Sequence, residues 1–273
     1  FQNISNVFSY SQINSYRRCP YQYKLAHILH LPTKGNASFS FGQTMHSTLQ
    51  KFYLRMRELN SVKQDTLFSS PLSKGGAGGI LASVKAPALE ELLMLYEKNW
   101  IDDWHESKKQ QEAYYQKGKE ILKIFYASQE NKWTIPVVLE GGFKIKIGSY
   151  TLGGRIDRID KLADGALEII DYKTGQSKEK LTVDDKDQLL IYQIAAQTLP
   201  EYRNIGPVDQ LTYFYLNDNL GVSFIGKDEE LEKIQNKILQ VIEQIRSWDF
   251  TATPSAHICA HCDFKDICEF RQL

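Results

Sequence analysis

The chain has 273 residues, and its 33 lysines and arginines balance 33 aspartates and glutamates, so its formal net charge is zero. This length allows one substantial hydrophobic core, or one core with an appended subdomain. The charge balance excludes a general electrostatic attraction to nucleic acid, so any phosphate-binding surface must be local. No apolar run is long enough to span a bilayer, so we expect no membrane partner and a cytoplasmic protein.

The first part of the sequence predicts helices. One helical element is expected over residues 9–29, with Ser9 or Ser11 as its N-cap and Pro20 in the first turn of a continuing or second helix. Residues 40–59 then carry apolar side chains close to helical spacing, which predicts an amphipathic helix.

The next stretch is less regular. The Ser/Gly-rich segment 60–84 indicates a flexible connection. Two further helices are expected at about 86–107 and 110–131, and both are rich in aromatic residues. Aromatic rings at this spacing usually pack in a core, with base stacking as the alternative for a few exposed rings.

From residue 135 the hydrophobic pattern changes to a period of two, which predicts three strands joined by turns at 148–149 and 163–165. The elements expected after them are a helix at 183–198, a strand at 210–219 and a long helix at 227–250. This order predicts an α/β fold with one mixed sheet flanked by helices. The GGAGG stretch lacks the Lys-Ser/Thr of a P-loop, so we expect no motor activity in this chain.

Two acidic residues, Asp157 and Asp171, lie on adjacent predicted strands, and Lys173 follows the second by two positions. Because side chains alternate across a strand, Asp171 and Lys173 share one face and Tyr172 points to the other. Two carboxylates beside an ammonium suit Mg²⁺, which leaves much of its shell to water and phosphate oxygens. The alternative is a surface hairpin with ordinary solvated charges. Metal-dependent phosphodiester hydrolysis is favoured because an Asp that ends an apolar stripe is costly unless it is paired or bound to metal.

The chain has four cysteines, one near the start and three near the end in a C-x2-C-x5-C pattern: Cys19, Cys259, Cys262 and Cys268. Thiolates spaced this closely usually bind one metal centre, and a fourth from a distant segment completes the coordination. Disulfides are less expected because the sequence has no signal peptide. Zinc and an iron–sulfur cluster both suit four cysteines, and the spacing does not decide between them.

Taken in order, these motifs resemble those of a PD-(D/E)XK nuclease of the RecB-like group, in its iron–sulfur branch. That branch includes the nuclease domains of AddB-type helicase–nucleases and the nuclease associated with CRISPR adaptation. In it, one cysteine precedes the nuclease core and three follow with the spacing found here. The positions that match the family histidine, the first acid, the D-x-K pair and the Q-x3-Y pair are His46, Asp157, Asp171, Lys173, Gln188 and Tyr192.

The resemblance implies a restriction-endonuclease-like core, with an iron–sulfur subdomain formed where the two chain ends meet. Its four parts are the first half of that subdomain, a helical region with the motif histidine, the nuclease core and the cysteine-rich second half: 1–34, 35–134, 135–250 and 251–273. The implied cofactor of the subdomain is one structural 4Fe–4S cluster on the four cysteines, with zinc as the alternative.

The resemblance also implies a site for one or two Mg²⁺ or Mn²⁺ ions. The implied ligands are His46, Asp157, Asp171 and the backbone carbonyl of Tyr172. Lys173 would orient or deprotonate the attacking water or stabilise developing charge, and Gln188 and Tyr192 would support the site from a helix. Glu140 is either an additional metal carboxylate or a solvated charge at a strand end. Without the resemblance, a lone helical histidine would be an ordinary boundary residue.

Basic residues beside these motifs are the candidates for local contacts with DNA phosphates. The predicted DNA-binding residues are Arg17, Arg18, Arg155 and Lys178, and the same stretches contain Lys24, Arg158 and Lys180.

The expected function is a metal-dependent DNA nuclease. The preferred form is a single-strand exonuclease domain of a helicase–nuclease in DNA repair or recombination, acting on DNA that is single-stranded or has a free end. A helicase domain is then expected in the same polypeptide or complex. The alternatives are a free-standing CRISPR-adaptation nuclease and a catalytically silent iron–sulfur module that binds DNA ends.

Overall fold

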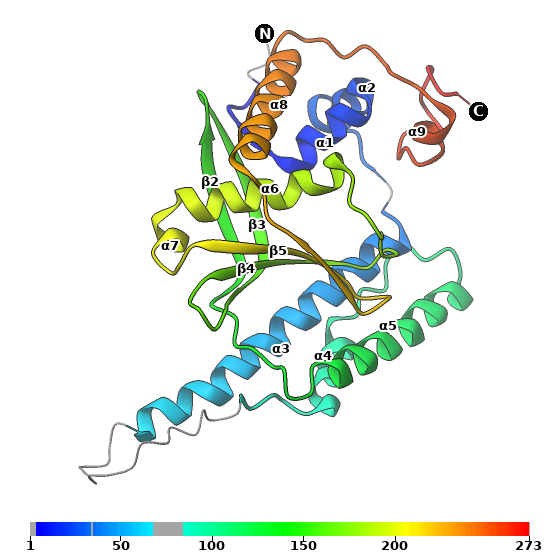
Figure 1. Ribbon diagram of the computed structural model, residues 1–273. Helices are drawn as coiled ribbons and strands as arrows, with labels where there is room; N and C mark the ends of the chain where they lie inside the picture. Colours follow the sequence, from blue (N-terminus) through cyan, green and yellow to red (C-terminus); the bar gives the residue numbers. More distant parts are fainter. Residues whose placement is uncertain (1–3, 34, 68–83, 273) are drawn as a thin grey trace.

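A mixed sheet forms the centre of the protein (Figure 1). The computed structural model describes residues 4–33, 35–67 and 84–272. The strands of the sheet are β1 Val7–Ser9, β2 Val138–Ile147, β3 Tyr150–Lys161, β4 Leu167–Lys173, β5 Val208–Tyr215 and β6 Leu220–Phe224. Their order is β1, β3, β4, β5, β6, with β2 paired to β3 outside this path. The β1/β3 and β4/β5 pairs are parallel and the other pairs are antiparallel, which confirms the predicted α/β class with a mixed sheet.

Two strands share one edge of β3. Strand β2 pairs with β3 from Tyr150 to Ile159 and so occupies the other edge. On the shared edge, β1 pairs with residues 151–153 and β4 pairs with residues 158–161. Within the described part of the chain, residues 154–157 therefore have no strand partner on that edge. This opening in the sheet lies next to the first acid of the predicted site.

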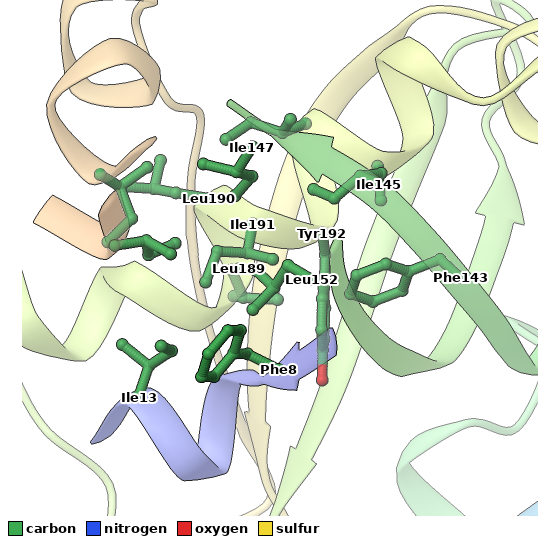
Figure 2. Close-up of a cluster of buried hydrophobic side chains, with 14 of the residues drawn as sticks. Phe8, Ile13, Phe143, Ile145, Ile147, Leu152, Leu189, Leu190, Ile191 and Tyr192 are labelled. Atoms are coloured by element: carbon green, nitrogen blue, oxygen red, sulfur yellow. The ribbon is translucent and has the colours of Figure 1, made fainter. Parts of the chain in front are cut away.

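Three helices cover one face of the sheet: α1 Tyr10–Arg18, α6 Val183–Thr198 and α8 Asp228–Arg246. Figure 2 shows Leu189 and Ile191 of α6 lying against Leu152 of β3 and Phe8 of β1. These four side chains are at most 2% exposed. Burial of each such side chain stabilises the fold by about 1.5–3 kcal/mol, so this layer fixes α6 against β1 and β3.

The opposite face is covered by α3 Ala37–Leu67, α4 Leu89–Asn99 and α5 Lys108–Ser128. The stripe expected from the sequence, Met45, Leu49, Phe52 and Met56, is fully buried and packs with Ile170 and Tyr172 of β4. Strand β4 is therefore covered on both faces, with alternate side chains in the two cores. Helix α3 lies on one face of β4 and α6 on the other, so side chains from both helices can contact residues at the end of this strand.

Several predicted boundaries are confirmed by local chemistry. Ser9, rather than Ser11, caps α1: its hydroxyl accepts from the backbone N–H of Gln12, whose side chain accepts from the N–H of Ser9. Pro20 begins a separate short helix, α2 Pro20–Tyr23, which continues as the π-helical turn Lys24–Ile28. The remaining short helices are α7 Pro200–Arg203 and α9 Ala256–Ala260.

Other boundaries were wrong. The expected strand at 210–219 ends at Tyr215, and the chain turns into β6, which the sequence did not predict. The expected helix at 86–107 ends at Asn99, and the helix expected to end at residue 250 ends at Arg246. The flexible connection expected from residue 60 begins later, because α3 continues to Leu67; residues 68–83 lie outside the described chain. None of the described helices has the length and apolar composition needed to cross a membrane.

Candidate active site

Three carboxylates lie in one row across neighbouring strands. The ladder pairs Leu139 of β2 with Arg158 of β3, and Arg158 with Ile170 of β4. One position further along each strand are Glu140, Asp157 and Asp171, so the register sets them side by side. Sheet geometry, rather than side-chain flexibility, brings these groups together.

The pairing of β3 with β4 stops at this row, whereas β2 and β3 stay paired on both sides of it. Glu140 has a backbone φ of +48°, in the left-handed region that residues with a Cβ rarely adopt. The carboxylate of Asp157 accepts the backbone N–H of Tyr172 at 3.0 Å from Oδ2. The backbone departs from the ladder where the carboxylates meet, and such strained positions are concentrated at functional sites.

His46 reaches this row from α3. Its Nδ1 lies 3.3 Å from Oδ2 of Asp157, and its Nε2 lies 3.0 Å from the carbonyl oxygen of Tyr172. His46, Glu140 and Asp157 each offer one ligand atom within 4.8 Å of the others. An imidazole nitrogen with carboxylate oxygens can hold a divalent cation, so the structure brings together a candidate metal site that includes Glu140.

The electrostatics of the site shift three pKa values. Burial, and next the charge of Asp157, raises the pKa of Asp171 to about 6 although the Lys173 ammonium opposes this. Burial alone would lower the pKa of His46, but its bond to Asp157 and the charges of Asp157, Asp171 and Glu140 together outweigh burial and raise that pKa to about 9. Burial and the charge of Asp157 also raise the pKa of Glu140. Crowded carboxylates of this kind favour a bound cation, because a cation relieves their mutual repulsion.

Lys173 connects the carboxylate row to α6. Its Nζ lies 2.8 Å from Oδ2 of Asp171 and donates to Oε1 of Gln188 at 2.8 Å. The amide of Gln188 in turn donates to the hydroxyl of Tyr192 at 2.7 Å. Asp171 is 2% exposed, and its Oδ2 has this ion pair but no well-aligned hydrogen bond from any described residue. That buried oxygen therefore has capacity for a further ligand.

These groups line one cleft of about 690 Å³. The predicted residues that line it are His46, Glu140, Arg155, Asp157, Asp171, Tyr172, Lys173 and Gln188. Tyr192 lies behind Gln188 and does not line the cleft. Sequence reasoning missed one side of the cleft, where Phe39, Gln43, Ser47 and Gln50 of α3 face the carboxylates. Their spacing places them on the same helix face as His46, and that spacing was the available signal.

The basic residues predicted to contact DNA phosphates differ in their surroundings. Arg155 lies in the cleft and is well exposed, 3.6 Å from Glu140. Arg158 is only 5% exposed and bonds Asp160, Thr134 and the hydroxyl of Tyr172, so its assignment to a phosphate-binding surface was wrong.

Arg17 is also engaged within the protein. It donates to Asp184 at 2.7 Å and to Asp187 at 2.8 Å, and Asp187 is 2% exposed. Lys178 pairs with Asp185, whereas Arg18 is exposed. Neither Arg17 nor Lys178 lines the catalytic cleft. Both residues form ion pairs with α6, and a direct role in DNA contact remains a prediction for Arg17, Arg18, Arg155 and Lys178.

The four cysteines line one small cavity between α2 and the segment around α9. All four are free thiols in the structure. The hydroxyl of Tyr21 donates to Glu269 at 3.1 Å, and its ring packs edge-on against Phe270 with centroids 4.9 Å apart. The two ends of the chain therefore meet around the cysteines.

A cleft that gathers carboxylates, a lysine and a histidine is the kind of site in which a bound divalent cation can support phosphodiester hydrolysis. The chain belongs to the PD-(D/E)XK nuclease superfamily, whose family model matches residues 7–269. It is 27% identical over 284 residues to an ATP-dependent helicase/deoxyribonuclease polypeptide of Clostridium perfringens strain SM101, covering 91% of this chain and 23% of that protein. The chain thus spans about a quarter of the length of this relative.

A second relative has a similar extent. The Gene 69 protein of Mycobacterium phage L5 is 23% identical over 295 residues, covering 95% of each chain. Among solved structures, the crystal structure of SSO0001 aligns with 93% of this chain and 96% of its own, with 15% identity and a TM-score of 0.38.

Proposed function

We propose that the chain is a Mg²⁺- or Mn²⁺-dependent deoxyribonuclease that acts as a single-strand exonuclease. The observation that carries this proposal is the row of Glu140, Asp157 and Asp171, with Lys173 ion-paired at one end and His46 bonded to its centre. The name of the Clostridium perfringens relative supports DNA as the substrate and a helicase as the partner in the same polypeptide or complex.

The residues present fit a divalent metal. His46, Glu140 and Asp157 converge within 4.8 Å, and the nearby Asp171 has a buried oxygen with no aligned donor among the described residues. Together with the carbonyl of Tyr172, they supply the hard oxygen and imidazole donors that Mg²⁺ and Mn²⁺ accept. When bound, the metal would lower the pKa of a water molecule and neutralise charge on the phosphate oxygens.

The protein's own residues position the reacting groups. The Lys173 ammonium, held between Asp171 and Gln188, faces the carboxylate row, where it can orient the water or stabilise charge on the phosphate. Tyr192 fixes the amide of Gln188, so that its oxygen rather than its nitrogen faces Lys173. His46 is fixed at both nitrogens, by Asp157 and by Tyr172, and so approaches the site in one orientation.

We also propose that Cys19, Cys259, Cys262 and Cys268 hold one 4Fe–4S cluster. A tetrahedral zinc site with Zn–S bonds of about 2.3 Å brings its sulfur atoms to about 3.8 Å from one another. Among the described residues no three cysteine sulfurs lie within 4.8 Å of each other, although all four line one cavity. The resemblance to the iron–sulfur branch of the family supports a cluster over a single zinc ion. The cluster would join the chain ends and play no part in hydrolysis.

A free-standing nuclease is the second candidate. The phage relative aligns over 95% of its own length and so represents this extent of chain as a separate protein. The nuclease associated with CRISPR adaptation is the corresponding form within the family branch.

Cleavage assays with defined substrates test the main proposal. Purified protein with Mg²⁺ or Mn²⁺ should degrade linear single-stranded DNA and leave circular single-stranded DNA intact, and EDTA should stop the reaction. Labels at the 5′ or 3′ end give the polarity. Cleavage of circles would replace the exonuclease by an endonuclease, and no cleavage with either metal would favour a silent end-binding module.

A further inference from the structure

Two exposed aromatic rings line two adjoining hollows, one of which holds the carboxylates. Phe39, in the first turn of α3, lines the catalytic cleft and is 57% exposed. A second groove is lined by Trp104, which is 53% exposed, and shares Ser38 with the cleft. The two hollows therefore adjoin at the start of α3.

Other exposed rings in the described chain are already engaged. Trp248 packs edge-on against Phe250, and Phe270 packs edge-on against Tyr21. Among the described residues, Phe39 and Trp104 are the exposed phenylalanine and tryptophan without an aromatic neighbour. A scattered exposed ring needs no explanation, but two unpartnered rings in adjoining hollows, one of which holds the carboxylates, do.

The surroundings hold both rings in place. Trp104 has a backbone φ of +66°, and its indole packs so closely on Gly35 that a Cβ there would lie 2.5 Å from the ring. Phe39 follows the cap of α3, where the side chain of Asn36 accepts its backbone N–H at 2.9 Å. Phe39 lies two turns before His46, about 10 Å along the helix axis. A nucleotide beside the reacting phosphate can reach it.

The charge in the second groove indicates what the rings bind. The lining around Trp104 contains Glu106 but no lysine or arginine among the described residues. A strand in this groove therefore gains little from its phosphates. Its affinity must come from the faces of its bases, and a base in a duplex has those faces covered by its stacked neighbours.

We propose that Phe39 and Trp104 form a stacking track for unpaired bases, which selects single-stranded nucleic acid for the cleft. This proposal rests on the proposed function, because the track would bind the part of the substrate strand that extends away from the carboxylates. Aromatic stacking tolerates every base because each has a π-face, so the track provides strand selectivity without sequence specificity.

Binding measurements in an inactive background test the track. The Asp171→Asn protein is titrated with a labelled single-stranded oligodeoxynucleotide and with the matching duplex, by fluorescence anisotropy. Phe39→Ala and Trp104→Ala should each weaken single-strand binding at least about fivefold. Phe39→Tyr and Trp104→Phe should restore most of the affinity. Leu54→Ala is the control, because Leu54 is 41% exposed on α3 and lies outside the cleft.

Two readouts separate stacking from a general loss of structure. The slope of binding against salt concentration should stay unchanged in Trp104→Ala, because no phosphate contact is lost. An oligonucleotide with abasic sites should bind the parent protein weakly, and Phe39→Ala should then have no further effect.

The outcomes distinguish this inference from the proposed function. If both alanine variants bind single strands within about twofold of Leu54→Ala, or weaken duplex binding equally, the track is disproved, whether or not the protein cleaves DNA. If no metal supports cleavage but ring-dependent binding remains, the nuclease proposal fails and the track stands.

Discussion

The carboxylate row and the cysteine cavity are assembled in opposite ways. The carboxylates come from three strands that are consecutive in the sequence, between Glu140 and Asp171, and the strand register sets their spacing. The cysteines come from position 19 and positions 259–268, on segments with only short helices. The row is built by backbone hydrogen bonds, whereas side-chain contacts, among them those of Tyr21 with Glu269 and Phe270, hold the cysteine segments together.

The two candidate metal sites therefore differ in whether their assembly depends on a bound metal. The sheet positions the carboxylate row without a bound metal, so a metal would add catalytic chemistry and would not be needed for the row to form. The cysteine segments contain only short helices, so a metal centre that joins them would contribute directly to their folding. Substitutions in the row should therefore affect rate with little effect on stability, and substitutions of the cysteines should do the reverse.

The largest effect is expected from Asp171→Ala. Loss of a carboxylate at the row should lower the rate of Mg²⁺-dependent DNA cleavage at least about a thousandfold, about 4 kcal/mol of transition-state stabilisation. The change in melting temperature should be small, because the ion pair with Lys173 joins residues already fixed on one strand. Asp209→Ala is the matched control, since Asp209 is exposed on β5 and outside the cleft. Near wild-type cleavage by Asp171→Ala would remove Asp171 from the mechanism.

The next effect concerns the cysteines. Cys259→Ser should lose iron and fall in melting temperature by about 10 °C, since closing a loop of this length contributes about 5 kcal/mol. Binding of Mn²⁺ at the carboxylate row should persist in this variant, because the row does not depend on the cysteine site for its assembly. Iron analysis of anaerobically purified protein and calorimetry provide the measurements. One zinc per chain would replace the cluster but keep the shared site, and no metal at all would refute both.

A smaller effect is expected from Gln188→Ala. Gln188 bonds Lys173 but does not belong to the candidate metal ligands, and supports of this kind typically contribute roughly 10–100-fold to activity. Tyr192→Phe should cost less still, because it removes only the bond that orients the Gln188 amide. Steady-state kinetics measure both. A loss as severe as that of Asp171→Ala, in folded protein, would place Gln188 in the catalytic step.

The smallest effect is expected in the pH dependence of metal binding. The pKa of Asp171 is raised to about 6 and that of His46 to about 9, and both groups must lose a proton to bind metal. Raising the pH therefore strengthens binding: the logarithm of Mn²⁺ affinity should rise by about one per pH unit from pH 6 to 9, and more steeply below pH 6, where the carboxyls of Asp171 and Glu140 also become protonated. Calorimetric titration measures it. In His46→Gln the slope above pH 6 should vanish, and an unchanged slope would exclude His46 as a ligand.

Periodicity predicted the parts of this molecule that depend on local sequence. The buried stripe of α3 and the shared face of Asp171 and Lys173 followed from spacing alone. Roles set by distant partners could not be predicted. Arg17 and Arg158 look like free charges in the sequence, but Asp187 lies far from Arg17 in the chain, and Arg158 is buried by the helices packed over β3.

The pairing of β1 with β3 also bears on the order in which the chain folds. Val7 pairs with Thr151, so this contact closes a loop of more than half the chain, whereas β2, β3 and β4 are joined by short turns. Contacts between near neighbours form faster than those that must first close long loops. We expect the carboxylate row to assemble early and the amino-terminal strand, with Cys19 behind it, to dock late. The chain would then acquire its catalytic geometry before its two ends are joined.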